Sequence, residues 1–300
     1  MSTQENDFTE YMIIGSTKDY LLLFTNKGRV FWLKVYEIPQ SSRTSKGRSI
    51  VNLLDLEKDE KILTAIPVAD FDDRQLIMST ANGQIKKTAL EAYSNARKRL
   101  GIIAIVLGEG DSLIDVKLTD GESDVILTSQ KGLSIRFKEE EARSMGRVSR
   151  GVRGMSLAEG DQVISMNIVD NEKKIMTICE KGYGKKSSFD DYRTAHRGGR
   201  GVKTINNIER NGFVVRSLTV ADDDELLMLT QEGMVLRIST ADFRVLGRST
   251  AGVKLFRMKK DNDRIIAIVP LALSDEALDI PKEEVEGKEA SAEEPPKEES

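Results

Sequence analysis

The chain repeats an internal unit of roughly 50 residues, and this repeat constrains the fold more than any other feature of the sequence. Each of five copies holds an apolar run, a glycine, a second apolar or basic run, a polar loop and a second glycine. The spacing between the two glycines differs by no more than one residue among the copies, which is too regular for chance. The first glycine is Gly28, Gly83, Gly132, Gly182 or Gly233, and the second is Gly47, Gly101, Gly151, Gly201 or Gly252.

Each copy contains several runs of strand-forming residues. Runs rich in Val, Ile and Leu are bounded by turn residues, and NKG, ANG, QKG, EKG and QEG place glycine where a hairpin turn needs a positive φ. A further strand recurs as ILTAI, LIDVKL, VISMNI, VVRSLTV and IIAIV. Units of about 50 residues built from hairpins suit propeller blades, which protect their strand edges by closing into a ring.

The first residues of the chain resemble the last third of one more copy. Met1 and Ser2 align with Met155 and Ser156, and Asp7 aligns with Asp161. We therefore predict an all-β, propeller-like domain over residues 1–273, with about six blades of four-stranded antiparallel sheet. Five full repeats and a partial N-terminal repeat would form it.

The last stretch of the chain differs in composition from the repeats. Residues 274–300 contain 11 Asp and Glu residues against 3 lysines, with three prolines and no aromatic residue, so we predict an acidic disordered tail. The whole chain has 45 basic and 49 acidic residues; without the tail 42 and 38 remain, so the predicted domain is basic.

Several classes of function find no support in the composition. One cysteine and one histidine allow no disulfide framework and argue against a zinc site, and no nucleophile, acid–base pair or cofactor motif stands out. We therefore expect no catalytic residue, no metal and no cofactor. No signal pattern or apolar run of membrane length occurs, so we expect a cytoplasmic location without membrane contact.

Two charged positions recur in every copy. An arginine stands four residues before the second glycine, and an acid stands ten residues before it, at Glu37, Glu91, Glu141, Asp191 and Asp242. One interpretation is that the arginine and the acid pair within each blade. The other is that the arginines, with neighbouring cations, form a belt that binds phosphate. The predicted DNA contacts are Arg43, Lys46, Arg48, Arg97, Lys98, Arg99, Arg147, Arg150, Arg153, Arg193, Arg197, Arg200, Lys203, Arg244, Arg248 and Lys254.

The repeat, together with GRVFWLKVYEIP and SKGRSIVNLL (28–54), TANGQIKKT (80–88) and GVRGM (151–155), resembles the C-terminal domain of bacterial DNA gyrase A. That family has a first-blade basic box, Q-R-R-G-G-K-G, which would lie just upstream of Met1. HRGGRG (196–201) looks like a relative of this box in a later blade. DYRT (191–194) faintly resembles the sequence around the family's active-site tyrosine but lies in a repeat loop.

The resemblance implies a β-pinwheel, in which adjacent blades exchange a strand and duplex DNA wraps around the outer edge to support negative supercoiling. It implies no catalysis by this chain itself, a nucleoid-associated location, and as partners double-stranded DNA, the gyrase A catalytic core and gyrase B. The alternatives are the corresponding C-terminal domain of topoisomerase IV, which has a similar ring, and a protein-interaction β-propeller.

Deleting residues 274–300 should tighten DNA binding at low salt. The predicted tail carries charge opposite to that of the domain and competes with DNA for nearby cations within a Debye length of about 8–10 Å. The measurement is DNA affinity of the two chains at low and high salt, where the difference should shrink. Unchanged or weaker binding after deletion would reject competition by the tail.

Overall fold

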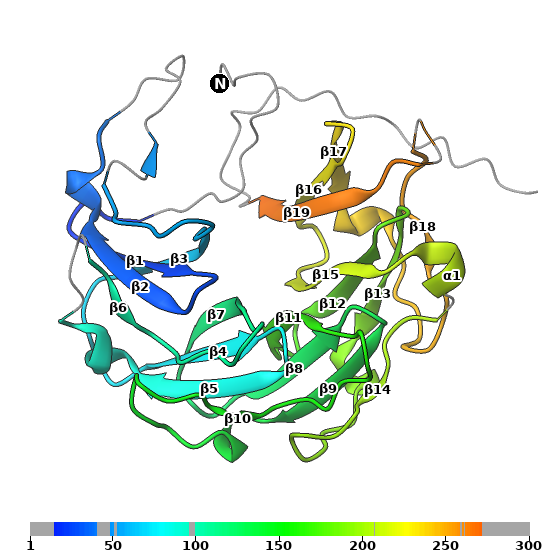
Figure 1. Ribbon diagram of the computed structural model, residues 1–300. Helices are drawn as coiled ribbons and strands as arrows, with labels where there is room; N and C mark the ends of the chain where they lie inside the picture. The colour runs from blue at the N-terminus through cyan, green and yellow to red at the C-terminus, as the bar shows by residue number, and fades with distance from the viewer. Residues whose placement is uncertain are drawn as a thin grey trace, which may run out of the picture.

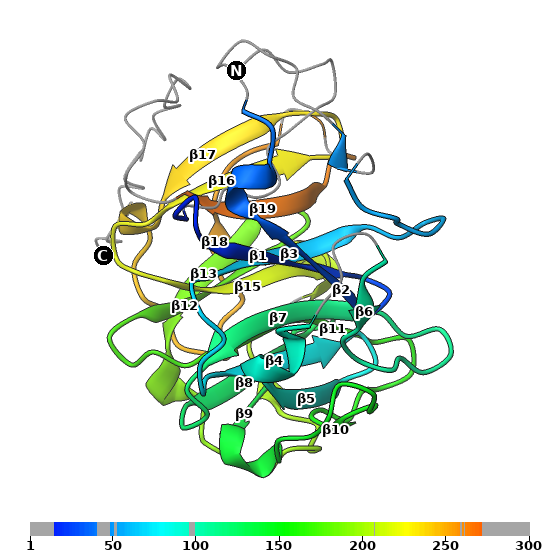
Figure 2. The ribbon, with the colours of Figure 1, turned by 90° about the vertical axis from the view of Figure 1, so that its left-hand side faces the viewer.

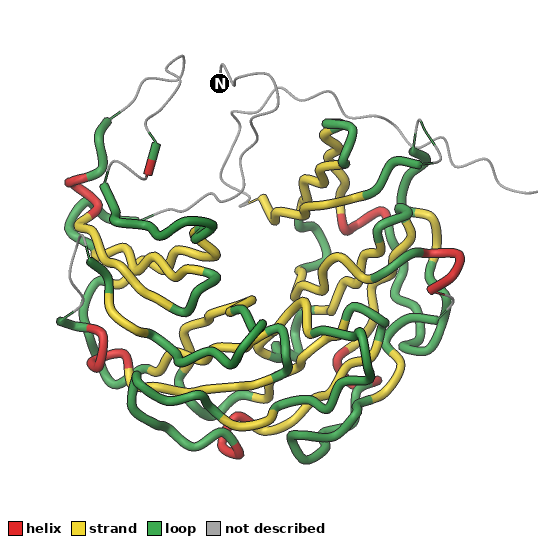
Figure 3. Tube along the Cα trace, viewed as in Figure 1, coloured by secondary structure: helices red, strands yellow, loops and turns green. Residues whose placement is uncertain are grey.

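Five antiparallel sheets stand in an arc around a common axis (Figure 1). The computed structural model describes residues 15–40, 49–50, 53–95, 100–206, 208–258, 260 and 262–271. Within them, short 3-10 turns and one four-residue helix, α1 (Ile208–Asn211), are the only helical elements (Figure 3). The predicted all-β propeller is confirmed. The partial N-terminal repeat and the acidic tail lie outside the described residues.

Each repeat contributes one hairpin, whose turn holds the first repeated glycine at positive φ. The hairpin strands are β1 (Tyr20–Thr25) and β2 (Arg29–Lys34), β4 (Gln75–Thr80) and β5 (Gln84–Ala89), β8 (Asp124–Ser129) and β9 (Leu133–Lys138), β12 (Lys174–Cys179) and β13 (Tyr183–Ser188), and β16 (Glu225–Thr230) and β17 (Val235–Ser239).

The further strand predicted in each repeat pairs with the first strand of its own hairpin and lies on the inside of the arc (Figure 1). Neighbouring inner strands are joined by side chains. Asn167, for example, donates its amide to the Ser217 carbonyl at 3.0 Å and accepts from the Thr219 N–H at 3.2 Å. The inner strands are β3 (Ile62–Val68), β7 (Leu113–Thr119), β11 (Val163–Ile168), β15 (Val214–Val220) and β19 (Ile265–Leu271).

The outermost strand of a sheet comes from the next repeat. It has two residues, follows the second repeated glycine, and pairs with the hairpin of the preceding copy, as with β6 on β2 (Figure 2). These strands are β6 (Ile102–Ile103), β10 (Val152–Arg153), β14 (Val202–Lys203) and β18 (Val253–Lys254). The strand exchange implied by the family resemblance is therefore confirmed. Among the described residues, the first four sheets have four strands and the fifth, β17–β16–β19, has three.

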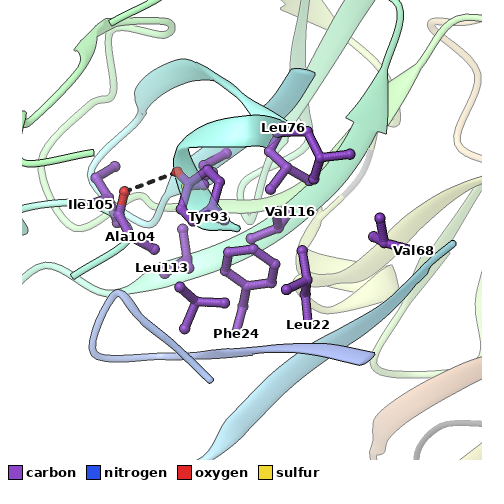
Figure 4. Close-up of a cluster of buried hydrophobic side chains, with 12 residues drawn as sticks. Leu22, Phe24, Val68, Leu76, Tyr93, Ala104, Ile105, Leu113 and Val116 are labelled. Atoms are coloured by element: carbon purple, nitrogen blue, oxygen red, sulfur yellow. Dashed lines mark hydrogen bonds between the residues drawn. The ribbon is translucent and has the colours of Figure 1, made fainter. Parts of the chain in front are cut away.

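Hydrophobic clusters lie between adjacent sheets, and one further cluster lies within the first copy. In β1, successive side chains point to opposite faces: Leu22 and Phe24 enter one cluster, while Leu21 and Leu23 enter another. The first cluster also contains Leu76 of the second sheet (Figure 4). Because both faces are covered, β1 is an unbroken apolar run rather than an alternating one. A blade thus depends on its neighbour for burial.

The second repeated glycine lies directly against the sheet that receives the outer strand. Gly151 has φ +84°, and a Cβ there would stand 2.5 Å from the Ile85 carbonyl oxygen. Gly201 has φ +79°, and its Cβ would stand 2.4 Å from the Ser134 carbonyl oxygen. Both the left-handed backbone and the close approach exclude a side chain. This explains why the spacing of the glycines is so regular.

Replacing Gly151 by alanine should lower the free energy of unfolding, by about 1–2 kcal/mol from the left-handed backbone alone. The matched control is Gly146→Ala in the same loop, because a Cβ there meets nothing within 4 Å. Its effect should stay within about 0.5 kcal/mol. Urea unfolding of both variants makes the comparison, and equal losses would contradict the packing role of Gly151.

Candidate nucleic-acid interface

Three described loops connect the repeated acid to the outer strand, and each crosses to the preceding sheet. The acids end short 3-10 helices, Glu139–Glu141, Phe189–Asp191 and Thr240–Asp242. Beyond each helix the chain forms a parallel bridge with the preceding hairpin, through Lys87 and Ser144, Arg136 and Thr194, and Lys186 and Val245. The loops then reach β10, β14 and β18 on the outside of the arc (Figure 1). Equivalent loops therefore occupy equivalent places on successive sheets.

The repeated arginine fastens each loop to the preceding copy. Arg197 donates from Nε to the Glu141 carbonyl at 3.0 Å and from Nη1 to the Arg153 carbonyl at 3.0 Å, and its backbone N–H donates to Glu141 Oε2 at 3.1 Å. Arg248 repeats this pattern on Asp191, with Nε at 3.0 Å from the carbonyl oxygen. We call this set of bonds the arginine staple.

The staple joins neighbouring copies and does not act within one copy. Pairing between the arginine and the acid of the same sequence copy is wrong for Arg197 and Arg248, whose acids are Glu141 and Asp191 of the preceding copies. The reason is strand exchange: the loop that carries the arginine leaves its own hairpin and crosses to the sheet before it. Arg147 donates from Nη1 to the Ile103 carbonyl at 3.0 Å, the contact equivalent to Arg197 with Arg153.

Two buried lysines donate hydrogen bonds to backbone carbonyls of these loops. Lys86 Nζ donates to the Ala104 carbonyl at 2.7 Å and to the Arg147 carbonyl. Lys185 Nζ donates to the Gly247 carbonyl at 2.7 Å and to the Arg248 carbonyl. Burial, with repulsion from the arginine above, lowers the pKa of each lysine to about 8. Backbone carbonyl oxygens are the main partners of these two lysines, so we assign both a structural role.

The next residue along the strand also reaches forward to the following copy. Lys87, Arg136 and Lys186 donate to carbonyls of the next 3-10 helix, those of Glu139, Phe189 and Thr240. The sequence analysis missed these contacts. The signal was present in IKKT and GKKS: two lysines in succession on a strand point to opposite faces, so they cannot both lie on one solvent-facing side, and in the structure both are buried.

The remaining described cations of the predicted belt are exposed. They are the rim cations, Arg150, Arg153, Arg193, Arg200, Lys203, Arg244 and Lys254. Within the described ranges, their side chains make no hydrogen bond or ion pair with another residue. Arg147, Arg197 and Arg248 are half-buried and committed to carbonyl oxygens. The predicted contacts Arg43, Lys46, Arg48, Arg97, Lys98 and Arg99 lie outside the described residues.

Tyr192, Cys179 and His196 are the other described residues with reactive side chains that the sequence analysis considered. Tyr192 of DYRT is buried, its hydroxyl meets the Thr204 hydroxyl, and burial raises the pKa of Tyr192 to about 12. Cys179 is a buried thiol whose pKa burial raises to about 12. His196 is exposed beside Glu141. Among the described residues, no group of three or more His, Cys, Asp or Glu side chains is arranged to hold a metal ion.

An arc of hairpin sheets that exchange outer strands and carry a basic outer edge defines the class as a strand-exchanged β-propeller. The family model described as "DNA gyrase C-terminal domain, beta-propeller" matches residues 19–69, 74–120, 123–170, 173–221 and 224–272, one match for each repeat. The chain belongs to the DNA gyrase C-terminal domain family.

Individual relatives agree with this assignment. The DNA gyrase A protein of Halalkalibacterium halodurans is 48% identical over 280 residues, which are 93% of this chain and 33% of the relative. The DNA gyrase A protein of Streptococcus pneumoniae is 46% identical over 286 residues, 95% of this chain and 34% of the relative. The chain thus spans about a third of the length of the curated relatives that it matches.

Two solved structures share the fold. A crystal structure of the C-terminal domain of DNA topoisomerase IV matches with a TM-score of 0.79 and 30% identity, over 85% of this chain and 80% of that chain. A structure of the DNA gyrase A C-terminal domain matches with a TM-score of 0.74 and 26% identity, over 90% and 89%. Both structures are therefore close in shape to this chain.

Among the described residues, none of the helices has the length and apolar composition that a membrane span requires.

Replacing Arg197 by alanine should lower the free energy of unfolding by about 1.5–3 kcal/mol, because the staple's charge-assisted hydrogen bonds are lost. The matched control is Arg200→Ala in the same loop, which removes an exposed guanidinium and should stay within about 0.5 kcal/mol. Denaturant unfolding of both variants tests this division. Equal losses, or a larger loss for Arg200→Ala, would contradict the staple.

Proposed function

We propose that this chain binds duplex DNA through phosphates, without reading bases, and bends the DNA along the outer edge of its sheets. The rim cations carry the proposal, because they are exposed, have no counter-ion among the described residues and recur on successive blades. An arginine guanidinium offers a planar fork of donors that suits phosphate oxygens. Contacts of this kind position a duplex but carry no sequence information.

The shape of the arc supports bending as well as binding. Duplex DNA has a persistence length of about 50 nm, so curving it around a small domain costs free energy. Cations at equivalent positions on successive sheets can offset this cost along the whole curve. The staple adds to this by holding each loop against the preceding sheet, so that the rim cations project from a fixed backbone.

The staple arginines and the rim cations would then have different roles. Arg147, Arg197 and Arg248 hold the loops, and the rim cations contact phosphate. Arg200 shows the division best, since it lies three residues from Arg197 in the same loop and has no partner of its own within the described ranges. Phosphate contact by the outlying set, Arg43, Lys46, Arg48, Arg97, Lys98 and Arg99, stays a prediction.

The relatives suggest where this activity is used. They are DNA gyrase A proteins, and this chain aligns with a third of their length. We infer that it serves as the DNA-wrapping part of gyrase A and supports negative supercoiling, with the gyrase A catalytic core and gyrase B as partners and the nucleoid as its location. Catalysis would belong to those partners and not to this chain.

Two other functions remain as rivals. The topoisomerase IV structure matches with a TM-score of 0.79, so that role fits the same ring. The curated relatives from Halalkalibacterium halodurans and Streptococcus pneumoniae are instead gyrase A proteins, at 48% and 46% identity. A protein-interaction propeller is the rival from another class, and it predicts no particular response of DNA binding to salt.

Binding to random-sequence duplex should weaken steeply with salt. If the rim neutralises about 6–10 phosphates, affinity should fall by about 10³–10⁵ between 50 and 200 mM salt. The double variant Arg193→Ala, Arg200→Ala should lower the slope of log affinity against log salt by about 1.8, because each phosphate contact contributes about 0.9.

The control removes two positive charges elsewhere. Lys117 and Lys173 line a cavity on the axial side of the sheets, so the double alanine variant there should leave the salt slope unchanged. Fluorescence anisotropy with a labelled duplex measures all three proteins. A flat salt response, preference for one sequence, or an equal change in both double variants would refute binding at the rim.

A further inference from the structure

We propose that Leu100, Ile103 and Val148 form an apolar patch on the outer edge that contacts the deoxyribose rings of bound duplex DNA. The chemical group recognised is the apolar face of the sugar between two phosphates. This inference rests on the proposed function and deepens it, because it assigns part of the affinity to a contact that salt does not screen. None of the three residues is among the predicted DNA contacts.

Two of the patch residues occupy positions that hold cations in later copies. Leu100 directly precedes the second repeated glycine, and Ile103 lies two residues after it. In the third and fourth copies the equivalent residues are Arg150 and Arg200 for the first position, and Arg153 and Lys203 for the second. The strand pairing is equivalent as well, since Ile103 and Arg153 each pair with the residue after a first repeated glycine. At β6 the outer edge therefore carries aliphatic side chains in place of charge.

Val148 belongs to the third copy, and its backbone lies against that of Ile103 in the second. Lys86 Nζ donates to the carbonyls of Ala104 and Arg147, the residues next to them in the chain. Arg147 Nη1 also donates to the Ile103 carbonyl at 3.0 Å. These bonds hold the two segments together on the outer side of the arc, where β6 and β10 lie (Figure 1).

The patch is exposed and carries no free charge of its own. Leu100 is 58% exposed, Ile103 46% and Val148 68%. Arg29, which pairs with Ile103 across the sheet, is already committed: it donates to the Leu100 carbonyl at 2.6 Å and to Glu60 Oε2 at 2.8 Å. A partner that covers these side chains removes apolar surface from water, which is favourable.

The sugar–phosphate backbone of DNA has the complementary chemistry. Anionic phosphates alternate along each strand with deoxyribose rings, whose carbon–hydrogen faces are apolar, and proteins contact both without reading the sequence. On this edge Arg150 follows Val148 by two residues, so a cation and an aliphatic side chain project from one loop. A protein partner is the alternative occupant, but the rim cations on the same edge favour a polyanion.

The test removes apolar surface without changing charge, in the full chain that carries Leu100→Ser, Ile103→Thr and Val148→Thr together. Affinity for a labelled random-sequence duplex should fall about tenfold at every salt concentration, because each methylene kept from water contributes a factor of about four. The slope of log affinity against log salt should stay the same, since no phosphate contact is lost.

Calorimetric titration at several temperatures gives a second readout. Apolar burial makes the heat-capacity change of binding negative, so this change should be smaller in magnitude for the triple variant than for the parent chain. Val148→Thr alone, which exchanges a methyl for a hydroxyl in an exposed loop, should weaken binding about threefold at an unchanged slope. Thermal unfolding should not differ among these proteins, because the altered side chains are exposed.

The matched control is Ile266→Thr, because Ile266 is also an exposed strand isoleucine, 52% exposed, but lies on the inner strand β19. It should leave affinity and heat-capacity change unaltered. A flat salt response of the parent chain would refute the proposed function and this inference with it. If the parent slope is steep, three results would overturn the inference alone: unchanged affinity of the triple variant, which would indicate a protein partner, a loss equal to that of Ile266→Thr, or an altered slope.

Discussion

The structure depends on the connection that each repeat makes to the one before it. A two-residue strand and its arginine staple leave one copy and complete the sheet of the preceding copy. The second repeated glycine makes this possible, because only a residue without a side chain fits against the receiving backbone at Gly151 and Gly201. With cores that also lie between sheets, no blade is complete alone, and stability is shared between neighbours.

The positively charged residues near this connection fall into two groups, one buried or half-buried and one exposed. Lys86, Lys185 and the staple arginines are buried or half-buried, and carbonyl oxygens satisfy them. A cation removed from water needs such partners, so these residues are committed to the scaffold. Arg200 and the other rim cations keep their contact with solvent and have no such commitment among the described residues. A rigid loop with free cations on its outer side is a suitable surface for a phosphate backbone.

Strand exchange also creates an asymmetry between the two ends of the arc. Every hairpin that is followed by another described repeat receives a strand, and the fifth hairpin has none among the described residues. An unpaired edge is a site for association as well as a hazard. At β17 the repeated acid Asp242 is exposed, and the Gly233 carbonyl receives no hydrogen bond from the described residues.

The sequence alone determined the class of fold, because glycine spacing and strand-forming runs leave little choice other than a ring of hairpins. It also identified the arginines and acids, since five copies supply an internal comparison. It did not determine their partners: Arg197 lies six residues from Asp191 in the chain, yet it binds Glu141. Only the tertiary structure decided this, because exchange carries a loop to the preceding sheet, and spacing along a chain contains no information about which sheet a loop crosses to. The burial of Lys86 and Lys185, and the exposure of Arg200, followed from that same crossing.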